Sequence, residues 1–315
     1  MSHTPILLDG KSIAQKTFDL CAARVKQIIA KTGKTPCLAT VLVGEDPASA
    51  TYVKMTGKRC EEVGMKSLRV TLPAETTTEQ LVKKIAELGA DPAISGILLQ
   101  HPVPKHIDER AAFEAIPPIK DVDGVTIHSF GAMSLASGGS GGSGSHGSGG
   151  GGGGGGDGGW PRFGPWGHVP GCCTPAGIMR LLEAYKINVS GKHAVVIGRS
   201  AILGKPMAMM LLAGDATVTI CHSRTKDLPS IVRQGDIIVA AVGKAKFVQG
   251  DWIKEGAIVI DAGYNAGNVG DVDYDAAYAK SSMITPVPGG VGPMTIATLI
   301  DQTSIAAAWQ WGVSL

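Results

Sequence analysis

The stretch of sequence that decides the fold runs from residue 195 to residue 206 and reads VVIGRSAILGKP. Its apolar start, its glycines and its helical end predict a strand, a tight loop and a helix. Gly198 permits a close backbone approach, and the first amides of a helix form an anion-binding site. Because Arg199 and Ser200 stand where the GxGxxG fingerprint has its second glycine, the spacing alone fits a pyrophosphate loop or an ordinary turn equally well.

Strands and helices alternate on both sides of this loop. Apolar runs predict strands at 37–43, 67–72, 95–100, 193–197, 217–221, 236–242 and 257–262. Helical patterns occupy 11–31, 49–63, 78–88, 174–185, 205–212 and 228–233. Thr174 followed by Pro175 is a typical helix start, so we expect Thr174 to cap its helix. Alternation of this kind predicts parallel sheets with right-handed crossovers. A last helix from residue 294 to about 311 can return to cover the first part of the chain.

We therefore expect an α/β protein of two domains with a cleft between them. Residues 1–125 and 293–315 would form a substrate domain with parallel strands. Residues 126–137 and 172–292 would form a Rossmann-like, doubly wound nucleotide domain. Residues 138–171 hold 19 of the 44 glycines and predict a flexible linker between them. Its GGSGGSGS repeat suggests an engineered insert, with natural low-complexity expansion as the alternative.

Composition excludes several classes of function. A net charge of +2 over 315 residues leaves no footprint for nucleic acid or an anionic membrane. No stretch is long enough to span a membrane, and the N-terminus lacks the pattern of a signal peptide. The six cysteines form no CxxC pair or zinc spacing, so we expect reduced thiols, no metal site and a cytoplasmic protein.

The strand after the glycine loop ends in the run CHSRT at residues 221–225. A site that selects NAD commonly has an acidic residue here to hold the ribose hydroxyls. This chain has hydroxyls and the cation of Arg224, with Arg199 as a second candidate. Because an arginine fork suits a 2′-phosphate, the sequence favours NADP over NAD. Taken alone, Arg224 is explained equally well as a solvated surface residue.

Residues 288–296 read PGGVGPMTI, between an apolar run and the last helical one. Taken alone, such a run is first of all a tight turn. It closely resembles a signature of the bifunctional methylenetetrahydrofolate dehydrogenase/cyclohydrolase (FolD) family. The runs GRSxxxGxP at 198–206 and CHSRT at 221–225 resemble the NADP loops of that family. The run CTPAG at 173–177 resembles its helix start, although Cys172 stands where the family usually has proline.

The strand ends AVG at 241–243 and DAGYN at 261–265 resemble those that line the family's nicotinamide pocket. The resemblance covers nearly the whole chain outside the insert. It implies a homodimer that oxidises 5,10-methylenetetrahydrofolate with NADP, in one-carbon metabolism and purine biosynthesis. The cofactor residues it implies are Thr174, Gly198, Arg199, Ser200, Gly204, Pro206, His222, Ser223, Arg224, Ala241, Val242 and Gly243. The folate-side residues it implies are Tyr52, Gln100, Asp123, Pro288, Gly289, Gly290 and Pro293.

The chemistry of the folate fits three of these side chains. A pterin has a flat ring and an edge rich in donors, so Tyr52 can stack on it and Asp123 can accept from it. Gln100 can donate or accept at the end of its strand. Taken singly, Tyr52 is better explained by helix packing and Asp123 by a turn. After Gln100 the chain reads HPVP, where the family more often has LP.

The chain departs from the family at a catalytic position. Family members typically carry Tyr-x-x-x-Lys on this helix, which places both side chains on one face. Thr56 stands at the lysine position, and threonine has no titratable amine. Since the lysine is implicated in hydrolysis of the methenyl product, we expect dehydrogenase activity to survive and cyclohydrolase activity to be weakened or lost. The alternatives are full bifunctionality through another group, or a folate- and nucleotide-binding variant or scaffold without turnover.

Overall fold

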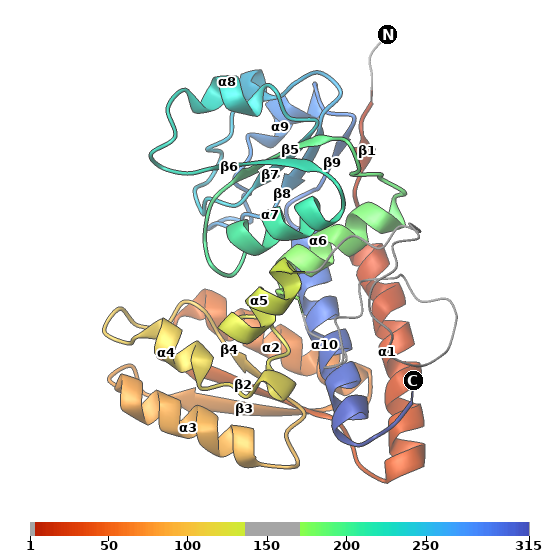
Figure 1. Ribbon diagram of the computed structural model, residues 1–315, viewed down its shortest axis with the longest axis vertical. Helices are drawn as coiled ribbons and strands as arrows, with labels where there is room; N and C mark the ends of the chain where they lie inside the picture. The colour runs from red at the N-terminus through yellow and green to blue at the C-terminus, as the bar shows by residue number, and fades with distance from the viewer. Residues whose placement is uncertain (1–3, 136–170, 315) are drawn as a thin grey trace.

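The computed structural model describes residues 4–135 and 171–314 (Figure 1). These residues form two sheets whose paired strands all run parallel, one of six strands and one of three. The expected α/β class is thereby confirmed. Apart from Gly171, the glycine-rich stretch 138–171 lies outside the described residues, so its predicted flexibility and origin stay predictions.

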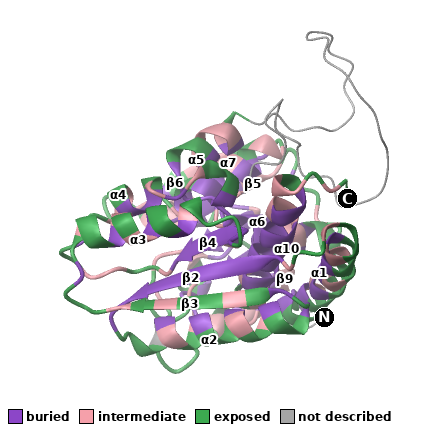
Figure 2. Ribbon diagram, turned by 90° about the horizontal axis from the view of Figure 1, so that it is seen from below, coloured by how far each residue is buried: buried purple, intermediate pink, exposed green. Residues whose placement is uncertain are grey.

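The smaller sheet has the strand order β3-β2-β4. Its strands are β2 (Cys37–Val43), β3 (Lys66–Leu72) and β4 (Gly96–Leu99), joined by α2 (Pro47–Glu62) and α3 (Thr78–Ala90). The central strand β2 is buried along its whole length, whereas β3 at the edge is largely exposed (Figure 2). A reciprocal capping box between Thr77 and Gln80 fixes the start of α3.

The larger sheet has the strand order β1-β9-β8-β7-β5-β6. Its strands are β1 (Ile6–Leu7), β5 (His193–Ile197), β6 (Thr217–Cys221), β7 (Ile237–Ala240), β8 (Ile258–Asp261) and β9 (Met283–Ile284). The helices along it are α7 (Gly204–Ala213), α8 (Leu228–Val232) and α9 (Tyr274–Tyr278). Although residues 1–125 were expected in the other domain, β1 pairs with β9 here. Strands of two residues are too short for periodicity to reveal them.

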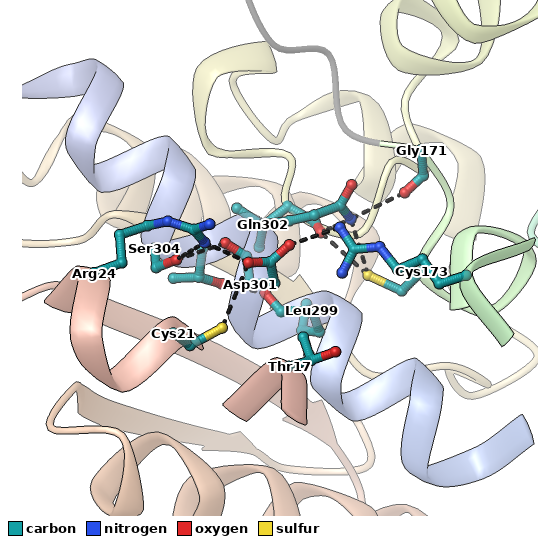
Figure 3. A network of polar contacts seen from close by, with 12 residues as sticks. Thr17, Cys21, Arg24, Gly171, Cys173, Leu299, Asp301, Gln302 and Ser304 are labelled. Carbon is teal, nitrogen blue, oxygen red and sulfur yellow. Dashed lines mark hydrogen bonds and ion pairs between the residues drawn. The ribbon is translucent and has the colours of Figure 1, made fainter. Parts of the chain in front are cut away.

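Three helices connect the sheets: α1 (Gly10–Thr32), α6 (Cys173–Ala184) and α10 (Val291–Gln310). Helix α10 packs against α1, α6 and β2, so the last helix does return onto the first domain (Figure 1). It begins three residues earlier than the expected Met294. The buried carboxylate of Asp301 joins the helices by pairing with Arg24 of α1 and Arg180 of α6 (Figure 3).

The sequence did not predict the short helices α4 (Glu109–Glu114) and α5 (Ile127–Ser134) or the turns of 3₁₀ helix at Pro118–Lys120 and Gly250–Trp252. Within the described ranges, no helix is long and apolar enough to cross a membrane. Over the same residues, no group of three or more His, Cys, Asp or Glu side chains is placed to hold a metal ion.

Candidate active site

The glycine loop after β5 is closely packed at the carboxyl end of the larger sheet. Gly198 has a φ of +134°, and a Cβ there would lie 2.2 Å from the carbonyl oxygen of Ala241. A Cβ on Gly204 would lie 2.2 Å from the carbonyl oxygen of Gly198. Both positions therefore require glycine. The Ser200 hydroxyl accepts from the amides of Leu203 and Gly204 at 3.2 and 3.3 Å, which fixes the start of α7.

The run 221–225 forms a compact turn at the end of the neighbouring strand β6. The amide of His222 donates to the Thr225 hydroxyl at 2.8 Å, and the amide of Arg224 donates to His222 Nδ1 at 3.2 Å. Both Ser223 and Arg224 remain exposed, as does Arg199 in the glycine loop. The turn therefore presents hydroxyl and cationic groups and no acid, a donor set that suits a phosphate better than a ribose diol.

The loop after β7 packs against Gly198 from the side opposite to the 221–225 turn, because β7 and β6 flank β5 in the sheet. The amides of Val242 and Gly243 donate to one carboxylate oxygen of Asp271, at 2.6 and 2.8 Å. Asp271 is completely buried, and sequence reasoning missed it. Its signal in the sequence is an acid close after the run DAGYN, but only the folded chain brings it to the loop.

Tyr52, Gln100 and Asp123 lie in the smaller domain, and Asp123 lies at its border with α6. Burial raises the pKa of Asp123 to about 7, although Cys173 and His101 nearby oppose the rise. Burial, followed by the charge of Asp123, also raises the pKa of Tyr52. The fold thus brings Tyr52 and Asp123, two of the predicted site residues, close to each other. Asp121, two residues earlier, has a structural role instead, because its carboxylate accepts from Val125, Thr126 and Ser129.

Gln100 directly follows β4, where its side-chain amide donates to the carbonyl oxygen of His101 at 2.8 Å. Its Oε1 is buried and has no hydrogen-bond partner among the described residues. The imidazole of His101 pairs with Glu109 of α4. Sequence reasoning noted the unusual HPVP run but missed that His101 lies near enough to Asp123 to influence its ionisation.

Thr56 is fully buried in α2, one turn after Tyr52. Its hydroxyl donates to the carbonyl oxygen of Tyr52 at 2.9 Å. A hydroxyl that bonds its own helix in this way supplies neither a cation nor a proton acceptor at neutral pH. Lys54 and Lys58, on either side of it, are exposed.

The turn from Pro288 to Gly290 joins the larger sheet to the starts of two helices. The amide of Lys11 donates to the Gly289 carbonyl at 3.0 Å, and a Cβ on Gly10 would lie 1.8 Å from the Gly290 carbonyl oxygen. Gly289 has a φ of +110°, which glycine tolerates without strain. Pro293 lies in the first turn of α10.

Thr174 was expected to cap the helix that follows the insert, and that expectation was wrong. Helix α6 begins one residue earlier, at Cys173, and Cys172 is its N-terminal cap residue. The Thr174 hydroxyl instead accepts from Thr295 of α10 at 3.2 Å. It therefore joins α6 to the helix that follows the PGGVGP turn.

Comparisons with known proteins agree with this arrangement over both domains. Residues 8–123 match the family model described as the tetrahydrofolate dehydrogenase/cyclohydrolase catalytic domain. Residues 172–311 match the NAD(P)-binding domain of the same family. The chain belongs to the tetrahydrofolate dehydrogenase/cyclohydrolase family. The match to the NAD(P)-binding domain includes residues 293–311, which we had expected in the substrate domain.

Curated relatives of the family are similar over almost their entire length. The chain is 55% identical to Bifunctional protein FolD 1 of Streptomyces avermitilis, across 99% of this chain and 98% of the relative. It is 56% identical to Bifunctional protein FolD of Acidobacterium capsulatum, across 98% of this chain and 99% of the relative.

Solved structures of the family share the fold. The bifunctional FolD enzyme of Campylobacter jejuni is 42% identical, with a TM-score of 0.82, across 96% of this chain and 98% of the other. The FolD enzyme of Trypanosoma brucei, solved with NADP and an inhibitor, is 32% identical, with a TM-score of 0.84, across 97% of this chain and 98% of the other. These matches extend the family assignment to the arrangement of both domains.

Proposed function

We propose that this protein oxidises 5,10-methylenetetrahydrofolate to 5,10-methenyltetrahydrofolate with NADP. The observation that carries the proposal is the place of Asp123. This acid of the catalytic domain lies beside Tyr52 of α2 and interacts with Cys173, the first residue of α6 in the NAD(P)-binding domain. A substrate held by Asp123 and Tyr52 would therefore lie at the border of the two domains, where a hydride can pass to a bound nicotinamide.

The residues of the larger domain fit NADP. The glycine loop from Gly198 to Pro206 would hold the pyrophosphate, and the exposed Ser223 and Arg224 would hold the 2′-phosphate beside His222. Residues 241–243 and Thr174 would border the nicotinamide. When bound, NADP supplies the hydride acceptor, so the protein itself contributes mainly alignment and exclusion of water.

The folate side contributes binding and orientation. Tyr52 would stack on the pterin, and Asp123 would accept from its donor edge. Gln100 lies at the end of β4. Its buried Oε1 lacks a hydrogen-bond partner in the described structure and can accept from the folate. We also propose that Pro288, Gly289, Gly290 and Pro293 border the folate.

Hydrolysis of the methenyl product is the second candidate activity. The names of the two curated relatives, each a bifunctional protein, favour it over the loss of hydrolysis that Thr56 led us to expect. Thr56 provides no group for proton transfer. Asp123 can exchange a proton near neutral pH, because burial raises its pKa to about 7. We therefore propose a bifunctional enzyme in which Thr56 limits the second step.

The remaining proposals follow from the family resemblance. We propose a cytoplasmic homodimer that forms through the nucleotide domain. Strand β6 lies at the edge of the larger sheet, so one side of its backbone is available to pair with a second copy. Its exposed Ile220 adds an apolar side chain to that edge. We also keep the division into a substrate domain of residues 1–125 and 293–315 and a nucleotide domain of residues 126–137 and 172–292, with the exception of β1, which pairs with the larger sheet.

One assay tests these proposals. NADPH and methenyltetrahydrofolate are followed together after NADP is added to 5,10-methylenetetrahydrofolate. NADPH without accumulation of the methenyl product, after spontaneous hydrolysis is subtracted, would support bifunctionality. Accumulation of both would mean a dehydrogenase whose cyclohydrolase step has failed. Absence of NADPH would exclude the proposed oxidation and favour a binding protein without turnover.

A further inference from the structure

The carboxylate of Asp271 binds the loop after β7 through consecutive backbone amides. Its Oδ2 accepts from Val242 and Gly243 at 2.6 and 2.8 Å, and its Oδ1 accepts from Lys244 at 2.9 Å. The side-chain amide of Asn265 donates to the same Oδ1 at 3.0 Å. A carboxylate can accept all four hydrogen bonds. The side-chain NH2 of an asparagine at this position would instead face N–H donors that it cannot accept from.

A second carboxylate holds Asp271 itself. Asp261, at the end of β8, accepts from the amides of Asp271, Val272 and Gly263, each at 2.9 Å. A Cβ on Gly270 would lie 1.9 Å from Asp261 Oδ2. This close contact requires glycine at residue 270, directly before Asp271. The backbone that carries Asp271 is therefore tightly packed against Asp261.

The network continues to the PGGVGP turn. The amide of Asp261 donates to the Thr285 hydroxyl at 2.7 Å, and Thr285 lies three residues before Pro288, where that turn begins. A Cβ on Gly290 would lie 2.7 Å from the Cβ of Thr285. On the other side, the amide of Ala241 donates to the Ile197 carbonyl at 2.8 Å, next to the glycine loop. One set of contacts therefore crosses the adjacent carboxyl ends of β5, β7, β8 and β9.

We infer that Asp271 and Asp261 are positioning residues for hydride transfer, which set the loop at residues 241–244 relative to the turn at residues 286–290. The inference rests on the proposed function. Neither carboxylate needs to touch a ligand, because the oxygens of each accept hydrogen bonds from backbone amides and, in Asp271, also from the side chain of Asn265. Their effect reaches the reaction through the loop expected beside the nicotinamide and the turn expected beside the folate, whose separation determines the distance that the hydride crosses.

The test compares Asp271→Asn with Asp273→Asn in the full-length protein. Asp273 is a matched control, because it lies two residues away and its carboxylate forms a partly exposed ion pair with Lys246, at 3.9 Å. For Asp271→Asn we expect kcat to fall by about 10²-fold, since small misplacements at a reacting centre cost that much. The Kd for NADP should change little, because the glycine loop and the 221–225 turn are untouched. The control should behave as the wild type.

A deuterium isotope effect separates positioning from a general loss of structure. With the methylene carbon of the substrate deuterated, the isotope effect on kcat should rise in Asp271→Asn, because hydride transfer becomes the slow step. An unstable protein would lose active molecules without changing the isotope effect. Hydrogen exchange of the amides at 242–244 gives a readout besides activity: they should be protected in the wild type and exchange faster in Asp271→Asn.

An unchanged kcat and isotope effect in Asp271→Asn would overturn the inference while leaving the proposed function intact. Should that variant fail to fold, Asn265→Ala removes one bond to Asp271 and one to the carbonyl oxygen of Val269. It should lower kcat several-fold with the same rise in isotope effect. Unchanged kinetics in Asn265→Ala would then overturn the inference. A wild-type protein that forms no NADPH would overturn the proposed function, and with it the inference.

Discussion

The hydroxyl of Thr56 donates a hydrogen bond to the carbonyl oxygen of Tyr52, 2.9 Å away and one turn earlier on α2. Both residues therefore lie on one side of the helix, at the spacing where the family carries its tyrosine and lysine. The threonine side chain is fully buried and bonds to its own helix. The position is thus occupied by a group that has neither a positive charge nor a titratable amine.

Restoring the amine should raise hydrolysis more than oxidation. In Thr56→Lys we expect the consumption of methenyltetrahydrofolate to rise by about 10²-fold, the lower end of the usual contribution of a general acid or base. Dehydrogenase activity should change far less. Thr56→Met is the control for side-chain length without an amine. If both variants hydrolyse at the wild-type rate, Thr56 does not limit the second step.

The ionisation of Asp123 should make both binding and stability depend on pH. Burial raises the pKa of Asp123 to about 7, far above the ordinary value for an aspartate. Since a carboxylate accepts better than a carboxylic acid, the KM for the folate should fall as pH rises through about 7. Asp123→Asn should weaken folate binding by about tenfold or more and abolish this inflection.

A rising pH should strengthen folate binding but lower the free energy of unfolding. Between the ordinary aspartate pKa and the raised one, the folded state binds more protons than the unfolded state, so a rising pH destabilises the fold. Asp123→Asn removes this charge and should therefore gain stability relative to the wild type from pH 5 to pH 8. Urea unfolding at pH 5 and at pH 8 measures the free energy of unfolding of the two proteins. The same pH dependence in the wild type and in Asp123→Asn would contradict the raised pKa of Asp123.

Removing the cation at residue 224 should lower the preference for NADP. In Arg224→Gln we expect the KM for NADP to rise by about 10- to 100-fold, the usual effect of losing charge-assisted bonds to a phosphate. The KM for NAD should stay the same, because NAD has no 2′-phosphate. Lys226→Gln removes the same charge from an exposed residue nearby and is the control. Equal effects on both cofactors would exclude a phosphate contact.

The buried ion pairs of Asp301 should contribute strongly to stability. Burial opposes ionisation of Asp301, but Arg180 and Arg24 outweigh it and lower the pKa of the carboxyl. Asp301→Asn leaves two cations facing an amide, so we expect the free energy of unfolding to fall by about 3–5 kcal/mol. Glu87→Gln, which breaks an exposed pair with Lys84, should leave stability unchanged in the same urea experiment.

The pH dependence of this effect has a definite sign. A lowered pKa stabilises the fold above the ordinary aspartate pKa, and this contribution is lost as pH falls through the lower value. The difference between the wild type and Asp301→Asn should therefore be constant near neutral pH and shrink on acidification. A difference in the free energy of unfolding that stays unchanged below pH 3 would contradict the lowered pKa of Asp301.

Local pattern predicted the regular elements well. The strands 37–43, 193–197 and 217–221 have the predicted bounds, because each is a largely apolar run that ends at a glycine or a polar residue. The strands β1 and β9 were missed, because two residues carry no period and pair only after the chain has folded. The start of α6 was misplaced by one residue and its N-terminal cap by two, since Cys172 rather than Thr174 is the cap residue.

The sequence by itself determined the fold class, the family and the missing lysine, because these depend on glycine loops, apolar periodicity and residue spacing along the chain. Only the tertiary structure showed that Asp271 holds the loop after β7 and is itself held by Asp261, that Asp123 lies half-buried beside Tyr52, and that Asp301 joins three helices. An acid's role depends on which amides and charges surround it, and most of those that surround these acids come from distant parts of the chain.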